Sequence, residues 1–163
     1  MAFSASMPKA VAHGIGDLEG LKDQVVGPSE WREVTQEMVD DFAELTGDHQ
    51  WIHVDVERAK AESPYGTTIA HGNLTLSLID GLRGSLNEWS GFKMAVNYGW
   101  NKVRFPAPVP VGSRVRGYAQ LVELDEVGGG WHQIVTRFTV EVEGGEKPVC
   151  VADSVGRVLA EAG

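Results

Sequence analysis

Two helical patterns stand out in the first half of the chain. Between Thr35, a residue type favoured at the start of a helix, and Gly47, which can adopt the left-handed conformation that ends one, apolar residues recur at helical spacing. A second apolar stretch runs from about residue 71 to 86, and its leucines do not keep to one face. The pattern predicts a first helix of about three turns and a second helix buried on most of its sides.

The segment between these helices is less regular. Residues 50–54 are few and mixed in polarity, so they predict a turn or a brief strand. Residues 56–61 predict a short helical turn, which ends at the turn-forming sequence Ser63-Pro64-Tyr65-Gly66. Any polar residue near position 50 therefore lies on backbone that follows directly from a helix end.

The second half of the chain has the character of strands. The third predicted strand alternates apolar and polar residues most regularly, which indicates one buried and one exposed face. Glycine-rich segments at 128–130 and 143–146 predict turns between neighbouring strands, and hence an antiparallel meander. Prolines at alternate positions in 106–112 favour an extended edge or a crossover. The strands are expected at residues 94–105, 113–125, 131–143 and 149–159.

A long buried helix and an antiparallel sheet have one obvious packing, so we predict an α+β fold in which a curved sheet wraps around the helix. The length of 163 residues fits one domain, which we place at residues 29–163 after a weakly structured lead-in at 1–28. Such a sheet leaves an edge to cover, which favours self-association.

Composition narrows the function and the compartment. A formal net charge of −9 makes a nucleic-acid partner or an anionic membrane surface unfavourable. No stretch is long and apolar enough for a membrane span, and the N-terminus lacks the pattern of a secretory signal. Cys150 is the only cysteine, which excludes an intrachain disulfide and suggests a reducing compartment. We therefore expect a cytoplasmic protein, with Cys150 acting as a small buried hydrophobe.

Candidate chemistry gathers around the end of the first helix and the start of the second. Asp48 precedes His53 by five residues, and His71-Gly72 stands where the second helix begins. An acid, a base and the free backbone N–H groups of a helix start are the groups that polarised acyl chemistry requires.

These residues carry a family resemblance. Phe42-Ala-Glu-Leu-Thr-Gly-Asp48, His53-Val-Asp55 and Ile69-Ala-His-Gly72 resemble the hydratase signature of the MaoC-like (R)-specific enoyl-CoA hydratases, including a nodulation-N-like subgroup. Lys102-Val-Arg-Phe-Pro-Ala-Pro-Val109 is similar to a later family segment. The resemblance implies the hot-dog fold and a homodimer. In one departure, Gln50-Trp51 stands where the family commonly has Asn-Pro.

The resemblance further implies a reaction in fatty acid metabolism: the reversible addition of water to a trans-2-enoyl-CoA, or to the same acyl group on acyl carrier protein, giving the (R)-3-hydroxyacyl thioester without a cofactor. It implies that Asp48 and His53 form the catalytic dyad, with the acid and base roles left open. Gly72 is expected to stabilise the thioester oxyanion through its backbone N–H, a role that the helix start also supports. Expected substrate contacts are His71, Asn73, Asn97, Tyr98, Lys102 and Arg104, with Arg114 and Arg116 as further candidates for the coenzyme A phosphates.

Other interpretations remain open at this point. A hot-dog thioesterase would hydrolyse the thioester instead, and a non-catalytic acyl-binding or nodulation-N-like protein would keep only the fold. His53 alone is typical of a structural histidine, and Gly72 of close helix packing. A metal site built from Asp48, His49, His53 and His71 is disfavoured, because their spacing matches no known closed ligand set, and we expect no metal.

Overall fold

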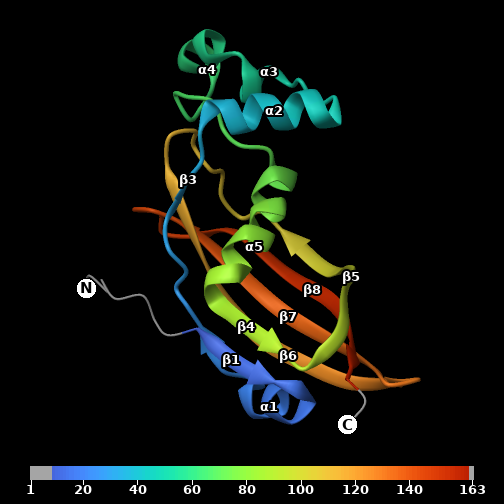
Figure 1. Ribbon diagram of the computed structural model, residues 1–163. Helices are drawn as coiled ribbons and strands as arrows, with labels where there is room; N and C mark the ends of the chain where they lie inside the picture. The colour runs from blue at the N-terminus through green and yellow to red at the C-terminus, as the bar shows by residue number, and fades with distance from the viewer. Residues whose placement is uncertain (1–8, 162–163) are drawn as a thin grey trace.

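The structure of the protein is a computed structural model that describes residues 9–161 (Figure 1). Helices and strands alternate irregularly in the first half, and four long strands make up the second. In chain order the elements are β1 (Ala10–His13), α1 (Gly14–Leu21), β2 (Val25–Val26), β3 (Arg32–Glu33), α2 (Gln36–Thr46), α3 (Trp51–Val54), α4 (Val56–Glu62), α5 (Gly72–Leu86), β4 (Asn87–Ser90), β5 (Phe92–Arg104), β6 (Arg114–Gly128), β7 (Trp131–Val142) and β8 (Pro148–Ala160).

A six-stranded antiparallel sheet forms the body of the molecule. Its strands follow the order β2-β6-β7-β8-β5, and β3 also pairs with β6. The long helix α5 lies against one face of this sheet, while α2, α3 and α4 gather at one end of the molecule and α1 at the other (Figure 1). The predicted α+β packing of a curved antiparallel sheet around one helix is therefore confirmed.

The predicted meander holds for three of the four long strands. β6, β7 and β8 pair in sequence, joined by the two glycine-rich turns. β5 instead pairs with β8 at the edge of the sheet, so the chain must cross over to reach β6. The proline-rich segment at 106–112 makes this crossover, as predicted, and it is held by the hydrogen bonds that Ala70 N–H donates to the Val109 carbonyl and Val111 N–H to the Thr68 carbonyl.

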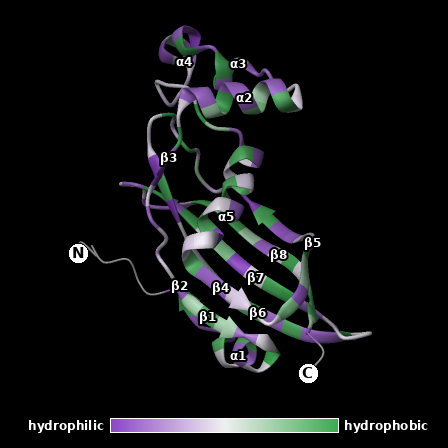
Figure 2. Cartoon of the chain, in the orientation of Figure 1, coloured by the Kyte–Doolittle hydropathy of each residue, from purple (hydrophilic) through white to green (hydrophobic). Residues whose placement is uncertain are grey.

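The main core lies between α5 and the sheet. Apolar and polar residues alternate along β6 and β7 (Figure 2), and the buried apolar residues of these strands belong to the same cluster as those of α5. Within residues 9–161 no helix is long and apolar enough to cross a membrane. The buried residues of this core include Leu78, Ile79, Leu82, Leu86, Val115, Ala119, Phe138, Val140, Cys150 and Ala152.

The predicted limits of α2 are confirmed in atomic detail. The Thr35 hydroxyl accepts a hydrogen bond from Met38 N–H, and Gly47 has a φ of 76° at the helix end. Of the two alternatives predicted for residues 50–54, a turn or a brief strand, the structure has the turn, which is helical at Trp51–Val54. This turn continues almost directly into α4, whose start is capped by Asp55 through the N–H of Arg58.

The lead-in contains more structure than the sequence suggested. Residues 10–26 form β1, α1 and β2, and β1 pairs in parallel with β4. Ala12 and Leu18 are fully buried against Leu121, Ile134 and Val158. The expectation of weak structure is thus wrong for these residues, since they cover a second part of the sheet; residues 1–8 lie outside the described chain. The domain boundary at residue 29 stays a prediction.

Candidate active site

Asp48 lies directly after the C-terminal end of α2. Gly47 closes the helix in the left-handed conformation, with its N–H donating to the Ala43 carbonyl, and Asp48 follows at once. The carboxylate is exposed, and its Oδ1 accepts a 3.4 Å hydrogen bond from Gln50 N–H. The acid therefore occupies a fixed position and keeps most of its hydrogen-bonding capacity for a ligand.

His53 lies in α3 and is only 8% exposed. Its Nδ1 is 2.7 Å from the Ile69 carbonyl oxygen. Because a carbonyl only accepts, Nδ1 carries the proton and the neutral ring presents its lone pair at Nε2. Burial lowers the pKa of His53 below the ordinary value of 6.5; the bond to Ile69 raises it, the nearby His71 lowers it, and the charge of Asp48 raises it. The net effect keeps the ring neutral and able to accept a proton at neutral pH.

His71 joins these two residues in space. Its ring stacks on that of His53, with 3.9 Å between the centroids, and its Nε2 lies 3.0 Å from the backbone oxygen of Asp48. The acid and base that the sequence spacing suggested are thus brought together, and His71 contacts both of them.

These three side chains were also the candidate metal ligands. One ligand atom from each of Asp48, His53 and His71 lies within 4.8 Å of the others, whereas His49 is exposed and faces Glu44. In each ring one nitrogen is already at hydrogen-bond distance from a backbone carbonyl oxygen, His53 Nδ1 from Ile69 and His71 Nε2 from Asp48. The absence of a metal stays a prediction.

Gly72 is the first residue of α5, so its N–H has no acceptor within the helix. His71 occupies the N-cap position, and its side chain makes no capping hydrogen bond. The positive end of the helix dipole adds to the attraction that this N–H exerts on a negative oxygen. The oxyanion role expected of Gly72 stays a prediction, and the uncapped helix start is the feature of the structure that bears on it.

His53 and Gly72 both line a pocket of about 330 Å³. Its other walls come from the loop before α5, from the proline crossover and from β8. The ring of Phe105 lies against Gly72, where a Cβ atom would come within 2.9 Å of two ring carbons. The remaining lining residues are Tyr65, Ile69, Ala70, Thr75, Pro106, Ala107, Pro108, Val109 and Val149.

Tyr65 and Phe105 are pocket residues that the sequence did not single out. Both are large apolar side chains with about half of their surface exposed, 48% for Tyr65 and 42% for Phe105. Tyr65 falls in a turn, and Phe105 directly precedes the prolines of the crossover. An aromatic residue beside a proline-rich crossover was the available signal, since such a segment fixes a side chain without pairing into the sheet.

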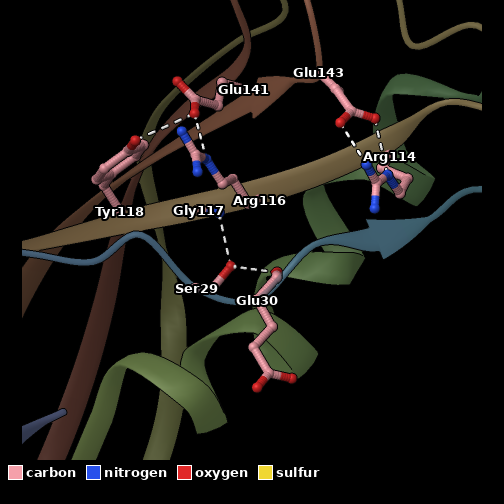
Figure 3. A network of polar contacts seen from close by, with 8 residues as sticks. All are labelled: Ser29, Glu30, Arg114, Arg116, Gly117, Tyr118, Glu141 and Glu143. Carbon is pink, nitrogen blue, oxygen red and sulfur yellow. Dashed lines mark hydrogen bonds and ion pairs between the residues drawn. The ribbon is translucent and has the colours of Figure 1, made fainter. Parts of the chain in front are cut away.

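The basic residues expected near coenzyme A fall into two groups. Arg114 forms an ion pair with Glu143, and Arg116 forms one with Glu141, which also accepts from the Tyr118 hydroxyl (Figure 3). These two guanidinium groups are already neutralised by carboxylates. Lys102 and Arg104 are exposed on β5, and within residues 9–161 neither has a carboxylate partner at ion-pair distance.

The other expected substrate contacts are not in the pocket wall. Asn73 is exposed on α5 next to Gly72, and Asn97 is exposed on β5. Tyr98 lines a different hollow together with Trp131, where the guanidinium of Arg157 stacks 3.6 Å over the tyrosine ring. His53 and Gly72 thus line one pocket, whereas Asp48 lies beside His53 without being a lining residue, and the polar residues of β5 do not line the pocket within a single chain.

The chain matches a known protein family. The family model of the MaoC like domain matches residues 17–144, which is most of the chain. The chain belongs to the MaoC-like dehydratase family, and it is an enzyme of the hydro-lyase class with the hot-dog fold of that family.

Two curated relatives and one solved structure illustrate the similarity. The chain is 54% identical to 3-hydroxyacyl-thioester dehydratase Z of Mycobacterium tuberculosis over 90% of its own length and 96% of that protein. It is 43% identical to Nodulation protein N of Rhizobium leguminosarum bv. viciae, over 85% of this chain and 87% of the relative. The crystal structure of a Monoamine oxidase regulatory protein from Archaeoglobus matches with a TM-score of 0.75 and 26% identity, covering 94% of this chain and 99% of that one.

Proposed function

We propose that this protein catalyses the reversible hydration of a trans-2-enoyl-CoA to the (R)-3-hydroxyacyl-CoA, with Asp48 and His53 as the catalytic dyad. The observation that carries the proposal is the bond from His53 Nδ1–H to the Ile69 carbonyl, which leaves Nε2 as a proton acceptor beside Asp48. Gly72, whose N–H has no acceptor within its own helix, lines the same pocket as His53. The mycobacterial relative, named as a 3-hydroxyacyl-thioester dehydratase, supports this assignment.

The proposed chemistry begins with a water molecule held between the two side chains. His53 Nε2 accepts a proton from this water while the water oxygen bonds to the β-carbon of the enoyl group. The alkene electrons move toward the thioester oxygen, and the N–H of Gly72 stabilises the negative charge that develops there. The dyad then returns the proton to the α-carbon, so that one water molecule has been added in total.

Asp48 has two tasks in this scheme. Its carboxylate orients the water by hydrogen bonding, and its negative charge stabilises the imidazolium that forms when His53 takes the proton. The same residues catalyse the reverse reaction, dehydration, because the forward and reverse reactions share one transition state.

We place the substrate thioester in the pocket beside Gly72 and the coenzyme A phosphates near the exposed Lys102 and Arg104. A protein with a net charge of −9 must supply local cations for an anionic ligand, and these two are free of carboxylate partners within the described residues. Acyl carrier protein as the acyl donor is the alternative. A cytoplasmic location stays a prediction.

The edge strand β5 supports a homodimer. Its outer edge has no partner within residues 9–161, and Met94, Val96 and Tyr98 on it are 50%, 40% and 59% exposed. An exposed apolar edge strand readily pairs with another chain. Pairing through β5 would bring the partner subunit next to Asn97, Lys102 and Arg104, where substrate contacts were expected.

Incubation of the purified protein with crotonyl-CoA tests the reaction. A hydratase lowers the absorbance of the conjugated enoyl thioester and releases no free thiol, and substitution of Asp48 by Asn abolishes the change. A thioesterase releases free coenzyme A while the alkene remains, which would contradict the proposal. A non-catalytic acyl-binding protein changes neither signal, even with substrates of several acyl lengths, and would also contradict it.

A further inference from the structure

We propose that His71 is the positioning residue of this site, through which Asp48, His53 and the start of α5 are set relative to one another. The inference rests on the proposed hydration for its kinetic consequences. It replaces the expectation that His71 contacts the substrate, because the side chain is only 3% exposed.

The ring of His71 is fixed from two sides. It stacks on His53, and the ring of Phe42 lies on it in a tilted arrangement with 5.1 Å between centroids. Phe42 belongs to α2 and His53 to α3, so the imidazole is clamped between two helices. A side chain held in this way supplies a rigid platform for the catalytic base.

The polar edge of the same ring anchors the acid. His71 Nε2 donates a 3.0 Å hydrogen bond to the backbone oxygen of Asp48, which fixes the tautomer with its proton on Nε2. Two other polar contacts of Asp48, with the Thr46 hydroxyl and with Gln50 N–H, are longer at 3.4 Å. The loop that presents the carboxylate is therefore tied mainly to His71.

His71 also leaves the N-terminus of α5 without a side-chain cap. A residue at the N-cap ordinarily accepts a hydrogen bond from the helix, as Thr35 does for α2 and Asp55 does for α4. His71 occupies this position in α5, but its side chain reaches to Asp48 and makes no capping bond. The N–H groups that a shorter polar residue would occupy are thus left for the thioester oxygen.

The remaining nitrogen of the ring makes no polar contact. His71 Nδ1 is buried and has no hydrogen-bond partner within the described residues. The ring therefore acts on the site through its stacked face and through Nε2.

Two substitutions of His71 distinguish the effect of its hydrogen-bond donor from the effect of its stacked ring. His71→Gln keeps an amide donor at about the distance of Nε2, and His71→Phe keeps the stacked ring but removes the donor. We expect His71→Phe to lower the kcat for crotonyl-CoA hydration by about 100-fold while KM changes little, because the loss affects the placement of Asp48 and not substrate binding. His71→Gln should retain most of the kcat. His13→Phe is the matched control: His13 is an exposed residue of β1 at the opposite end of the molecule, its ring contacts Ser90, and the variant should keep the kcat and KM of the wild type.

The pH profile gives a readout that a purely structural role would not move. The charged groups that act on His53 are His71 and Asp48. Both His71 variants should shift the acidic limb of kcat/KM to higher pH, because no second imidazole then opposes protonation of His53. A rise in KM at constant kcat, or a loss of activity that only follows the loss of folded protein, would overturn the proposal.

Nitrogen-15 NMR of the imidazoles tests the same inference without turnover. The chain has five histidines, so the ring signals can be assigned by substitution. We expect the His71 proton on Nε2, and a displaced backbone amide signal for His49, next to the Asp48 carbonyl, in His71→Phe. A His71 proton on Nδ1 would refute the positioning role even if the wild type hydrates crotonyl-CoA. Absence of hydration with the expected NMR result would refute only the proposed function.

Discussion

Substitution of Gly72 by Ala probes the contact between the helix start and the pocket wall. The new Cβ would lie 2.9 Å from two ring carbons of Phe105, whereas ordinary contact begins near 3.4 Å. The ring must therefore move by at least roughly 0.5 Å, the difference between these distances. Phe105 is 42% exposed, so it has room to turn.

The effects on stability and on catalysis should differ in size. Overpacking at a half-exposed ring costs about 1 kcal/mol, and the better helix propensity of alanine offsets much of it. The unfolding free energy of Gly72→Ala should therefore remain within ~1 kcal/mol of the wild type in urea titrations. The displaced ring and the new methyl group both intrude where the thioester oxygen approaches, so kcat/KM for crotonyl-CoA should fall by about 10- to 100-fold.

Two variants make this experiment decisive. Gly84→Ala lies on the same helix with no atom within 4 Å of its Cβ, so it should stabilise α5 without changing kcat/KM. Combining Gly72→Ala with Phe105→Leu should restore part of the activity, because the smaller side chain yields to the new methyl group. A folded Gly72→Ala enzyme with the kcat/KM of the wild type would refute the assignment of Gly72 to the oxyanion site.

Four further predictions follow from the same structure. Asp48→Asn and His53→Gln should each lower kcat by at least about 100-fold with little change in thermal stability, measured by crotonyl-CoA hydration and calorimetry; activity in either folded variant would contradict the dyad. The acidic limb of kcat/KM should lie below pH 6.5, because the lowered pKa of His53 keeps the base unprotonated until the pH falls through that lower value. A limb above pH 6.5 would contradict this. Burial raises the pKa of Cys150 to about 11, so mass spectrometry should show no alkylation by iodoacetamide in the native protein and complete alkylation after unfolding. Val96→Lys on the edge of β5 should produce a monomer in light scattering where the wild type is a dimer; a wild-type monomer would refute pairing through β5.

Local signals explain which elements the sequence predicts well. The helix α2 is bounded by a side-chain cap at Thr35 and a left-handed Gly47, and both act within a few residues. The alternation along β7 reflects burial on one face of a sheet, which every residue of the strand experiences separately. The spacing of the proposed dyad is local as well, since Asp48 directly follows the end of α2 and His53 lies five residues later.

Long-range contacts account for what the sequence does not predict. Nothing local indicates that β5 pairs with β8, because the choice of strand neighbour depends on the crossover and the whole sheet. The helical turn at Trp51–Val54 is stabilised from a distance, by the hydrogen bonds of Ile69 N–H to the Ile52 carbonyl and of the Gln36 side chain to the His53 carbonyl. The burial of Leu18 likewise depends on a sheet surface that forms from residues a hundred positions later.

The same distinction applies within the site. Sequence similarity and helix-end physics pointed to Asp48, His53 and Gly72, but the contacts of His71 with both Asp48 and His53 are visible only in three dimensions. The pocket residues Tyr65 and Phe105 come from segments on either side of the site that meet through the proline crossover. Substrate contacts proposed on β5 depend on a second subunit and remain predictions.

The most direct test of the central claim is the product formed from crotonyl-CoA by the wild-type protein, analysed on a chiral column after hydrolysis of the thioester. We predict (R)-3-hydroxybutyrate from the wild type and none from the folded Asp48→Asn protein. Formation of the (S)-product, of free crotonate, or of the same (R)-product by Asp48→Asn would contradict the proposed site.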